Sequence, residues 1–525
     1  MTTSASSAPF TPSHPFDLPD ADITLRSVDN VDFHVHKAIL SVASSVFRDM
    51  FSLPPPPDDT PLASPRPFVS LTEDSKTLEQ LLRFCYPINK PPLRELEDIV
   101  PVLKAALKYD MEWPTTLLTG ELGKIIPRKP LEVWACACQC GLLDLAQSAA
   151  IKVLSETMQG ENTKGSRLAK LYEMLESVGL GVLEGVVAGE LFRLRESVLS
   201  EDREASFVAS EPCSTTAGEA SPSMTIFYPR IVRPDVVIRC PDTTMHYAHE
   251  AILSLHSLVF EVMIHAQRRS QSCEVDKMAQ RVELEVEVGS NVLVPLLELC
   301  YGRVSDLPSA PSRLAPLLVA TNKYQMTQIH KIVQDRWDEM AKTSPLDAYF
   351  VAVQHGLNSQ ARHAARGVLE GPIDGAYARS MKSSSALSYY RLLQYYTSCT
   401  VAVNAQVEEA ITQWQQAIRN ARNQSGSRSS RNHSVQDAGS IEQYILGVTS
   451  SEEGPGRELT EVTLRTLLEQ SCAHEGSIWP QCSVQPCETI VNALMRLSSD
   501  LPAKIAEEIS KVRTSMKISG SARRG

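Results

Sequence analysis

The chain has 525 residues, of which 43% are hydrophobic and 22% charged, and its formal net charge is −11. This length predicts several domains, and the ordinary hydrophobic fraction predicts that most of the chain folds. The mild acidic balance argues against a protein that binds nucleic acid or anionic membranes, because such domains are usually basic.

The first residues carry no sign of a targeting segment. Met1–Asp20 has no basic start and no apolar run of signal-peptide length, so it does not resemble a signal peptide. Its mix of Ser, Thr, Pro and Ala predicts that residues 1–19 are disordered. Apolar stretches in the rest of the chain are interrupted by charges before they reach the roughly 18–20 residues that cross a bilayer. We therefore expect a cytoplasmic or nuclear protein that does not bind membranes, and whose twelve cysteines are reduced.

The first folded segment predicts a small sheet followed by helices. Asp22–Ser27 and Phe33–His36 are short β-rich runs that should pair across the turn between them. Apolar residues from Ile39 to Met50 recur at three- and four-residue spacing, which predicts one helix with a single apolar stripe. A proline-rich loop from Pro54, a strand at Phe68–Leu71 and two further helices follow, at Leu78–Tyr86 and Leu96–Tyr109.

This segment occurs twice. Residues 22–50 match residues 235–263 without a gap at an offset of 213, with 12 of 29 positions identical. The match resumes at an offset of 215, where Cys85-Tyr86 meets Cys300-Tyr301 and Lys108-Tyr109 meets Lys323-Tyr324. A period this long indicates duplicated domains. In the second copy the polar stretch Gln267–Lys277 stands where the first copy has its prolines, and is expected to be a loop.

The predicted fold class is α+β, with two small sheets, each surrounded by helices, then helical extensions and a mainly helical C-terminal segment. Linkers are indicated by tracts rich in Ser, Thr, Asn and Arg. The expected boundaries are 20–125 and 230–342 for the two copies, 126–200 and 343–419 for their extensions, 201–229 and 420–440 for the flexible linkers, and 441–525 for the C-terminal segment.

The residues that recur most closely resemble the BTB/POZ family pattern. They are Asp22, His36-Lys37, Ile39-Leu40, Ser44, Phe47 and Met50-Phe51 in the first copy, and Asp235, His249, Ile252-Leu253, Ser257, Phe260 and Met263 in the second. The resemblance implies a protein-interaction fold that forms homo- or heterodimers and binds partners along the dimer groove. It predicts a non-enzymatic scaffold whose partners include other BTB domains, and whose two copies can also pair within one chain. The alternative is a substrate adaptor that binds a cullin in a ubiquitin ligase.

The resemblance also implies a charged interaction pocket, built from the Asp and from the residue after the His. Asp22 and Lys37 keep this pair, whereas Asp235 and Glu250 place like charges together unless another group compensates. Six residues are expected to define the fold: His36, Leu40, Phe47, His249, Leu253 and Phe260. The hydrophobic-x-Glu signature of cullin-binding members is missing after the Met-Phe helix end, where the first copy reads Ser52-Leu-Pro-Pro.

Catalytic, cofactor and metal sites are not expected. A phosphate loop, a metalloprotease helix and a nucleophile elbow are all missing from the sequence. Among Cys136, Cys138 and Cys140 only the first and last share a helix face, which argues against zinc. A third and weaker hypothesis is a metal site formed by Cys472, His474, Cys482 and Cys487, although their spacing is not one of the usual paired forms.

Overall fold

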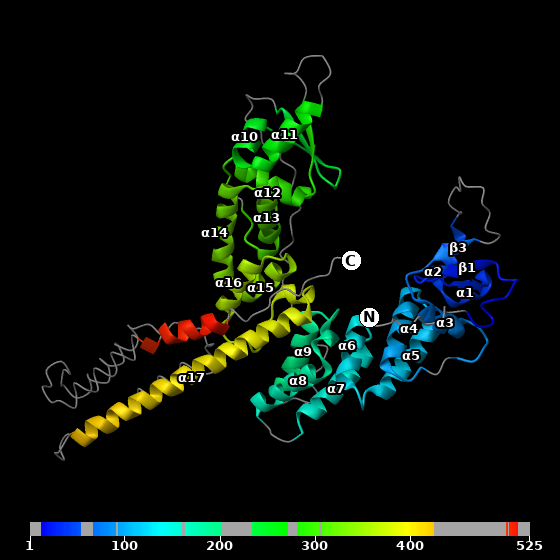
Figure 1. Ribbon diagram of the computed structural model, residues 1–525, viewed down its shortest axis with the longest axis horizontal. Coiled ribbons are helices and arrows are strands. Elements are labelled where there is room, and N and C mark those ends of the chain that lie inside the picture. Colours follow the sequence, from blue (N-terminus) through cyan, green and yellow to red (C-terminus); the bar gives the residue numbers. More distant parts are fainter. Residues whose placement is uncertain are drawn as a thin grey trace, which may run out of the picture. The chain divides into compact units, whose positions relative to one another are not determined.

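The computed structural model describes residues 12–53, 67–90, 93–159, 163–200, 234–270, 281–303, 307–424, 500–501 and 503–512. These residues form two compact units. One lies within Met1–Val186 and Arg193–Ala209, and the other within Val187–Phe192 and Ser210–Gly525. Each unit holds one copy of the repeat, and each copy has its own three-stranded sheet with helices packed beside it (Figure 1).

The first copy has the predicted α+β order. Its elements are β1 (Ile23–Arg26), β2 (Asp32–Val35), α1 (Lys37–Ala43), α2 (Ser45–Ser52), β3 (Phe68–Ser70), α3 (Ser75–Cys85), α4 (Leu96–Lys108) and α5 (Glu112–Ile125). The helices that follow are α6 (Pro130–Cys140), α7 (Leu143–Thr157), α8 (Lys164–Val178), the 3₁₀ helix η1 (Leu180–Leu183) and α9 (Ala188–Leu199).

The second copy repeats this order. It contains β4 (Val236–Arg239), β5 (Met245–Ala248), α10 (Glu250–His256), α11 (Leu258–Ser270), β6 (Val282–Glu285), α12 (Ser290–Cys300), α13 (Pro311–Lys323) and α14 (Thr327–Thr343). Its extension is made of α15 (Pro345–Gln354), α16 (Asn358–Val368), the 3₁₀ helix η3 (Arg379–Lys382) and the 39-residue α17 (Ala386–Gln424).

Side chains alternate between the two faces along each strand, and this alternation decides which face of each sheet is buried. In the first copy the order is β2-β1-β3, with β1 antiparallel to β2 and parallel to β3. The cross-strand pairs Ile23–Val35 and Leu25–Phe33 are buried, because alternate residues of a strand share one face. The second sheet has the equivalent order, β5-β4-β6. The predicted pairing of the first two strands is therefore confirmed.

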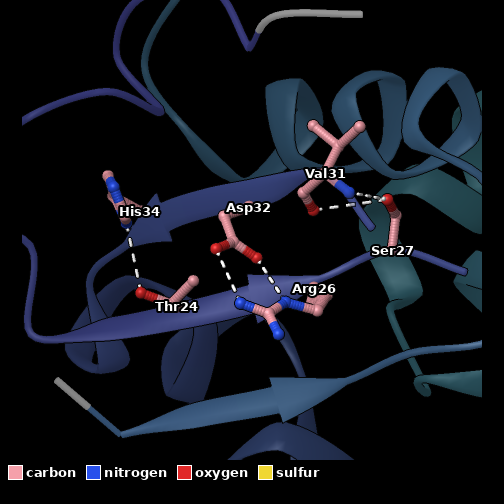
Figure 2. Close-up of polar contacts among 6 residues, drawn as sticks. All are labelled: Thr24, Arg26, Ser27, Val31, Asp32 and His34. Carbon is pink, nitrogen blue, oxygen red and sulfur yellow. Dashed lines mark hydrogen bonds and ion pairs between the residues drawn. The ribbon is translucent and has the colours of Figure 1, made fainter. Parts of the chain in front are cut away.

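The other face of the first hairpin is polar (Figure 2). Thr24 lies opposite His34, and its hydroxyl is 3.1 Å from the His34 Nδ1. Arg26 lies opposite Asp32 and donates two hydrogen bonds to that carboxylate, at 2.7 and 2.9 Å, which lowers the pKa of Asp32. The amide of Val31 donates to the Ser27 hydroxyl and closes the turn. These pairs fix the register of the strands, since pairs directly opposite each other stabilise a sheet most.

The single helix predicted from Ile39 to Met50 is wrong. The chain forms two helices, α1 and α2, that are separated at Ser44, whose backbone is extended. Ser44 ends the first helix because its hydroxyl accepts the Phe47 amide hydrogen and so caps the second helix. The second copy is interrupted in the same way at Ser257, where the hydroxyl accepts the Phe260 amide hydrogen at 3.0 Å. The three- and four-residue spacing of apolar residues continued across the interruption and concealed it.

Two further boundaries differ from expectation. Helix α11 extends to Ser270, so the first residues of the polar stretch from Gln267 are helical and not loop. The first copy has prolines from Pro54, which cannot continue α2, but the second copy has none at this point. Helix α17 continues to Gln424, past the expected start of the second linker at Asn420, because no glycine or proline interrupts this part. The rest of that linker, the first linker and the proline-rich loop lie outside the described residues.

The described end of the C-terminal segment is helical and lies beside α17 (Figure 1). Leu501, Ile505 and Ile509 are buried at four-residue spacing, and the Lys504 ammonium is 3.9 Å from a Glu409 carboxylate oxygen. This agrees with the mainly helical character expected for the C-terminal segment, whose other residues, 441–499, 502 and 513–525, lie outside the described residues.

Candidate protein-interaction site

The two aspartates of the expected pocket hold the start of a helix. In the first copy Asp22 Oδ1 accepts a hydrogen bond of 2.8 Å from the backbone amide of Lys37, the first residue of α1. In the second copy Asp235 Oδ1 accepts the same bond, also 2.8 Å, from the amide of Glu250. The first amides of a helix have no partner within the helix, and a carboxylate there also faces the positive end of the helix dipole.

The two side chains after the histidines differ in their surroundings. The Lys37 ammonium lies 5.9 Å from the centre of the Phe51 ring, within the range of a cation–π contact. Glu250 forms an ion pair with Arg268 of α11. Arg268 therefore supplies the compensating charge that the pair Asp235 and Glu250 required, and it is available because α11 is longer than α2.

Each histidine is tied to a tyrosine of a later helix end. The His36 backbone amide donates to the Tyr86 hydroxyl at 2.9 Å, and His36 Nδ1 is 3.2 Å from the same oxygen. In the second copy the His249 amide and Nδ1 are 3.1 and 2.7 Å from the Tyr301 hydroxyl. Burial raises the pKa of both tyrosines, so their hydroxyls stay protonated. In this arrangement the histidines join the strand, the first helix and the third helix of each copy.

A second tyrosine in each copy holds the helix junction. Ser44 Oγ donates to the Tyr109 carbonyl at 2.5 Å, and the Phe47 and Tyr109 rings stack with centroids 4.7 Å apart. Ser257, Phe260 and Tyr324 repeat both contacts with the same two distances. The six residues expected to define the fold include the two phenylalanines but none of the four tyrosines, although these recur in the sequence. Their recurrence at an offset of 215 was the signal that could have identified them.

Beside this shared framework, the two copies expose different side chains. Leu255 at the end of α10, and Leu258 and Val262 one turn apart on α11, are 74%, 58% and 57% exposed. The first copy keeps an exposed apolar residue only at the first of these positions, where Val42 is 84% exposed; the other two are Ser45 and Asp49. We call Leu255, Leu258 and Val262 the α10–α11 patch. Exposed apolar side chains that lie together on a surface can mark a protein-interaction site.

A family model for the BTB/POZ domain matches residues 18–124 and 231–340. These ranges contain both sheets and both helix junctions described above. The chain carries two BTB/POZ domains in tandem. No curated protein matches it. BTB domains are protein-interaction modules, so the Asp–amide, His–Tyr and Ser–Tyr contacts form the framework of two such modules, and the surfaces that differ are the places to look for partners.

Three other features bear on function: a repeated cysteine, the possible metal ligands and the apolar helices. Cys85 and Cys300 end equivalent helices; Cys85 is half-buried and Cys300 is buried, and desolvation raises the pKa of each thiol to about 12. Among the described residues, His, Cys, Asp and Glu do not gather in any group of three or more that could hold a metal. Cys472, His474, Cys482 and Cys487 lie outside the described residues. No described helix is both long and apolar enough to span a bilayer.

Proposed function

We propose that the chain is a non-enzymatic protein-interaction scaffold whose second BTB domain binds another BTB domain through the α10–α11 patch. The single observation that carries the proposal is the exposure of Leu255, Leu258 and Val262 on two consecutive helices. The occupant is a second copy of this chain, because the module that the patch belongs to is a self-associating one. Pairing of the two BTB domains within one chain is the competing arrangement.

Burial of the α10–α11 patch is expected to stabilise the dimer only modestly. Complete burial of a Leu or Val side chain contributes roughly 1.5–3 kcal/mol, and each member of the patch has over half of its surface still to bury. Three such residues would supply about 3–5 kcal/mol before the cost of association is subtracted. In the first domain Ser45 and Asp49 stand at two of the three positions, and burying them would add little or cost energy. The second BTB domain therefore gains more free energy than the first from burying this surface.

The test is the mass of the full chain in solution. Multi-angle light scattering over a hundredfold range of concentration should show a dimer, and the double variant Leu258→Glu with Val262→Glu should shift the midpoint of dissociation by tenfold or more. Val401→Glu is the matched control: Val401 is 64% exposed on α17, outside the patch, and its replacement should leave the mass unchanged.

Hydrogen exchange distinguishes dimerisation of two chains from pairing of the two BTB domains within one chain. If the domains pair within one chain, the mass is that of a monomer at every concentration, yet the double variant accelerates exchange in α10 and α11. A monomeric mass with no change of exchange in these helices would contradict the proposal, because the patch would then have no BTB partner of either kind.

An adaptor role in a cullin-type ubiquitin ligase is a narrower version of the same proposal. Its support is the BTB fold itself, and the sequence after α2 departs from the cullin-binding signature. Pull-down of the full chain with the N-terminal region of a cullin decides it. Absence of binding, under conditions where a known adaptor binds, would leave the scaffold without this role.

A further inference from the structure

The last helix of the second extension is much longer than the last helix of the first. Helix α17 has 39 residues, whereas α9 has 12. The two extensions otherwise share a pair of helices and a 3₁₀ helix before this point. The repeated fold therefore does not require the later part of α17, and this part is free to serve another purpose.

The later part of α17 has one buried apolar face. Its buried side chains in the described residues include Cys399, Val403, Val407 and Ala410. These residues recur at four- and three-residue spacing, so they lie along a single stripe of the helix. Val401, on another face, is 64% exposed. A helix face is buried only where another element covers it. We call the four buried residues the α17 seam.

The element that covers the α17 seam is the described end of the C-terminal segment. It forms a helix that lies beside α17, drawn red against yellow in Figure 1. We call its described residues, 500–501 and 503–512, the C-terminal strap. The Lys504 ammonium is 3.9 Å from a carboxylate oxygen of Glu409, which lies between Val407 and Ala410 of the seam. The buried stripe of the strap, formed by Leu501, Ile505 and Ile509, is thereby placed over the buried stripe of α17.

This contact is of a kind that another helix can replace. It rests on apolar burial, which is not directional. The pair of Lys504 and Glu409 contributes little, because the two side chains are 46% and 52% exposed. The strap is held in place because it belongs to the same chain as the seam, which gives it a high effective concentration. A separate helix with the same apolar stripe can therefore compete with it.

We propose that the α17 seam is a docking site for an amphipathic helix of a partner protein, and that the C-terminal strap is its competitor within the chain. The helix that fits carries aliphatic side chains at four-residue spacing, as the strap does. It also carries a basic residue beside them, because Glu408 and Glu409 are exposed next to the seam. A displaced strap stays attached to the chain, so it closes the seam again when the partner leaves.

The test uses a fluorescein-labelled peptide with the sequence of residues 490–513, whose binding to the full chain is followed by fluorescence anisotropy. The wild-type chain should bind it weakly, because its own strap occupies the seam. Ile505→Glu with Ile509→Glu should release the strap, and this variant should bind the peptide roughly tenfold more tightly. Ala506→Glu with Ser510→Glu is the matched control. It adds the same charges to the exposed face of the same helix and should bind like the wild type.

A change in α17 locates the binding site. Val407→Glu, added to the variant with the released strap, should abolish the gain in affinity, whereas Val401→Glu on the exposed face should preserve it. Circular dichroism confirms that each variant is folded. A released variant that binds the peptide no better than the wild type, or binding that survives Val407→Glu, would overturn the proposal. Neither result bears on self-association through the α10–α11 patch, because all these variants leave the patch unchanged.

Discussion

Replacing Ser44 with alanine removes two hydrogen bonds from the centre of the first BTB domain. The Ser44 hydroxyl accepts from the Phe47 amide at 3.0 Å and donates to the Tyr109 carbonyl at 2.5 Å, and the residue is almost completely buried. Alanine fills nearly the same space, so the change leaves no large cavity. It leaves a helix without its cap and a buried carbonyl without its donor.

The magnitude follows from these two losses. Loss of an N-cap hydroxyl costs about 1 kcal/mol, and a buried polar group left without a partner costs about 1–3 kcal/mol. The sum for Ser44→Ala is about 2–4 kcal/mol. Because Ser257 makes the same two contacts with Phe260 and Tyr324, Ser257→Ala should cost the second domain an equal amount.

Native-state hydrogen exchange of the full chain measures the two domains separately. Ser44→Ala should accelerate exchange in α2 and α4 by about 30- to 700-fold, since each 1.4 kcal/mol is a factor of ten, and leave α11 and α13 unchanged. Ser257→Ala should give the reverse. Ser52→Ala is the control, because its hydroxyl bonds to the Arg48 carbonyl on the exposed surface of the same helix. Equal effects of Ser44→Ala and Ser52→Ala would refute the reasoning.

Two further predictions concern the pH dependence of stability and the backbone conformation of two glycines. Hydrogen bonds from Lys108 and Tyr109 outweigh burial and lower the pKa of Glu73, so its stabilisation is complete above the unfolded value of about 4.5 and is lost as pH falls through the folded value. Glu73→Gln should therefore lower the urea midpoint of the first domain at pH 7 and have a smaller effect at pH 2.5; a constant difference would contradict this. Gly141→Ala and Gly356→Ala should each cost about 1–2 kcal/mol by thermal unfolding, because both glycines have φ of +69°; costs below 0.5 kcal/mol would count against it.

The partner of the Glu250 side chain could not be predicted from the sequence. The pairing of Asp235 with Glu250 was identified as unfavourable, and the compensating group was left open. Arg268 lies eighteen residues later, on a helix whose length follows from the absence of proline there. Whether Arg268 reaches Glu250 depends on how α10 and α11 pack against each other, and no spacing in the sequence specifies that packing.

The sequence by itself determined the duplication, the α+β class and the pairing of the first two strands, because these depend on local periodicity and on residues repeated at a fixed offset. The tertiary structure decided what the repeated residues contact. Tyr86 and Tyr109 reach residues fifty and sixty-five positions earlier, and such contacts are set by chain folding. The same reason applies to the surface that distinguishes the domains: the α10–α11 patch depends on which side chains the packing leaves exposed, and burial is a property of the folded chain.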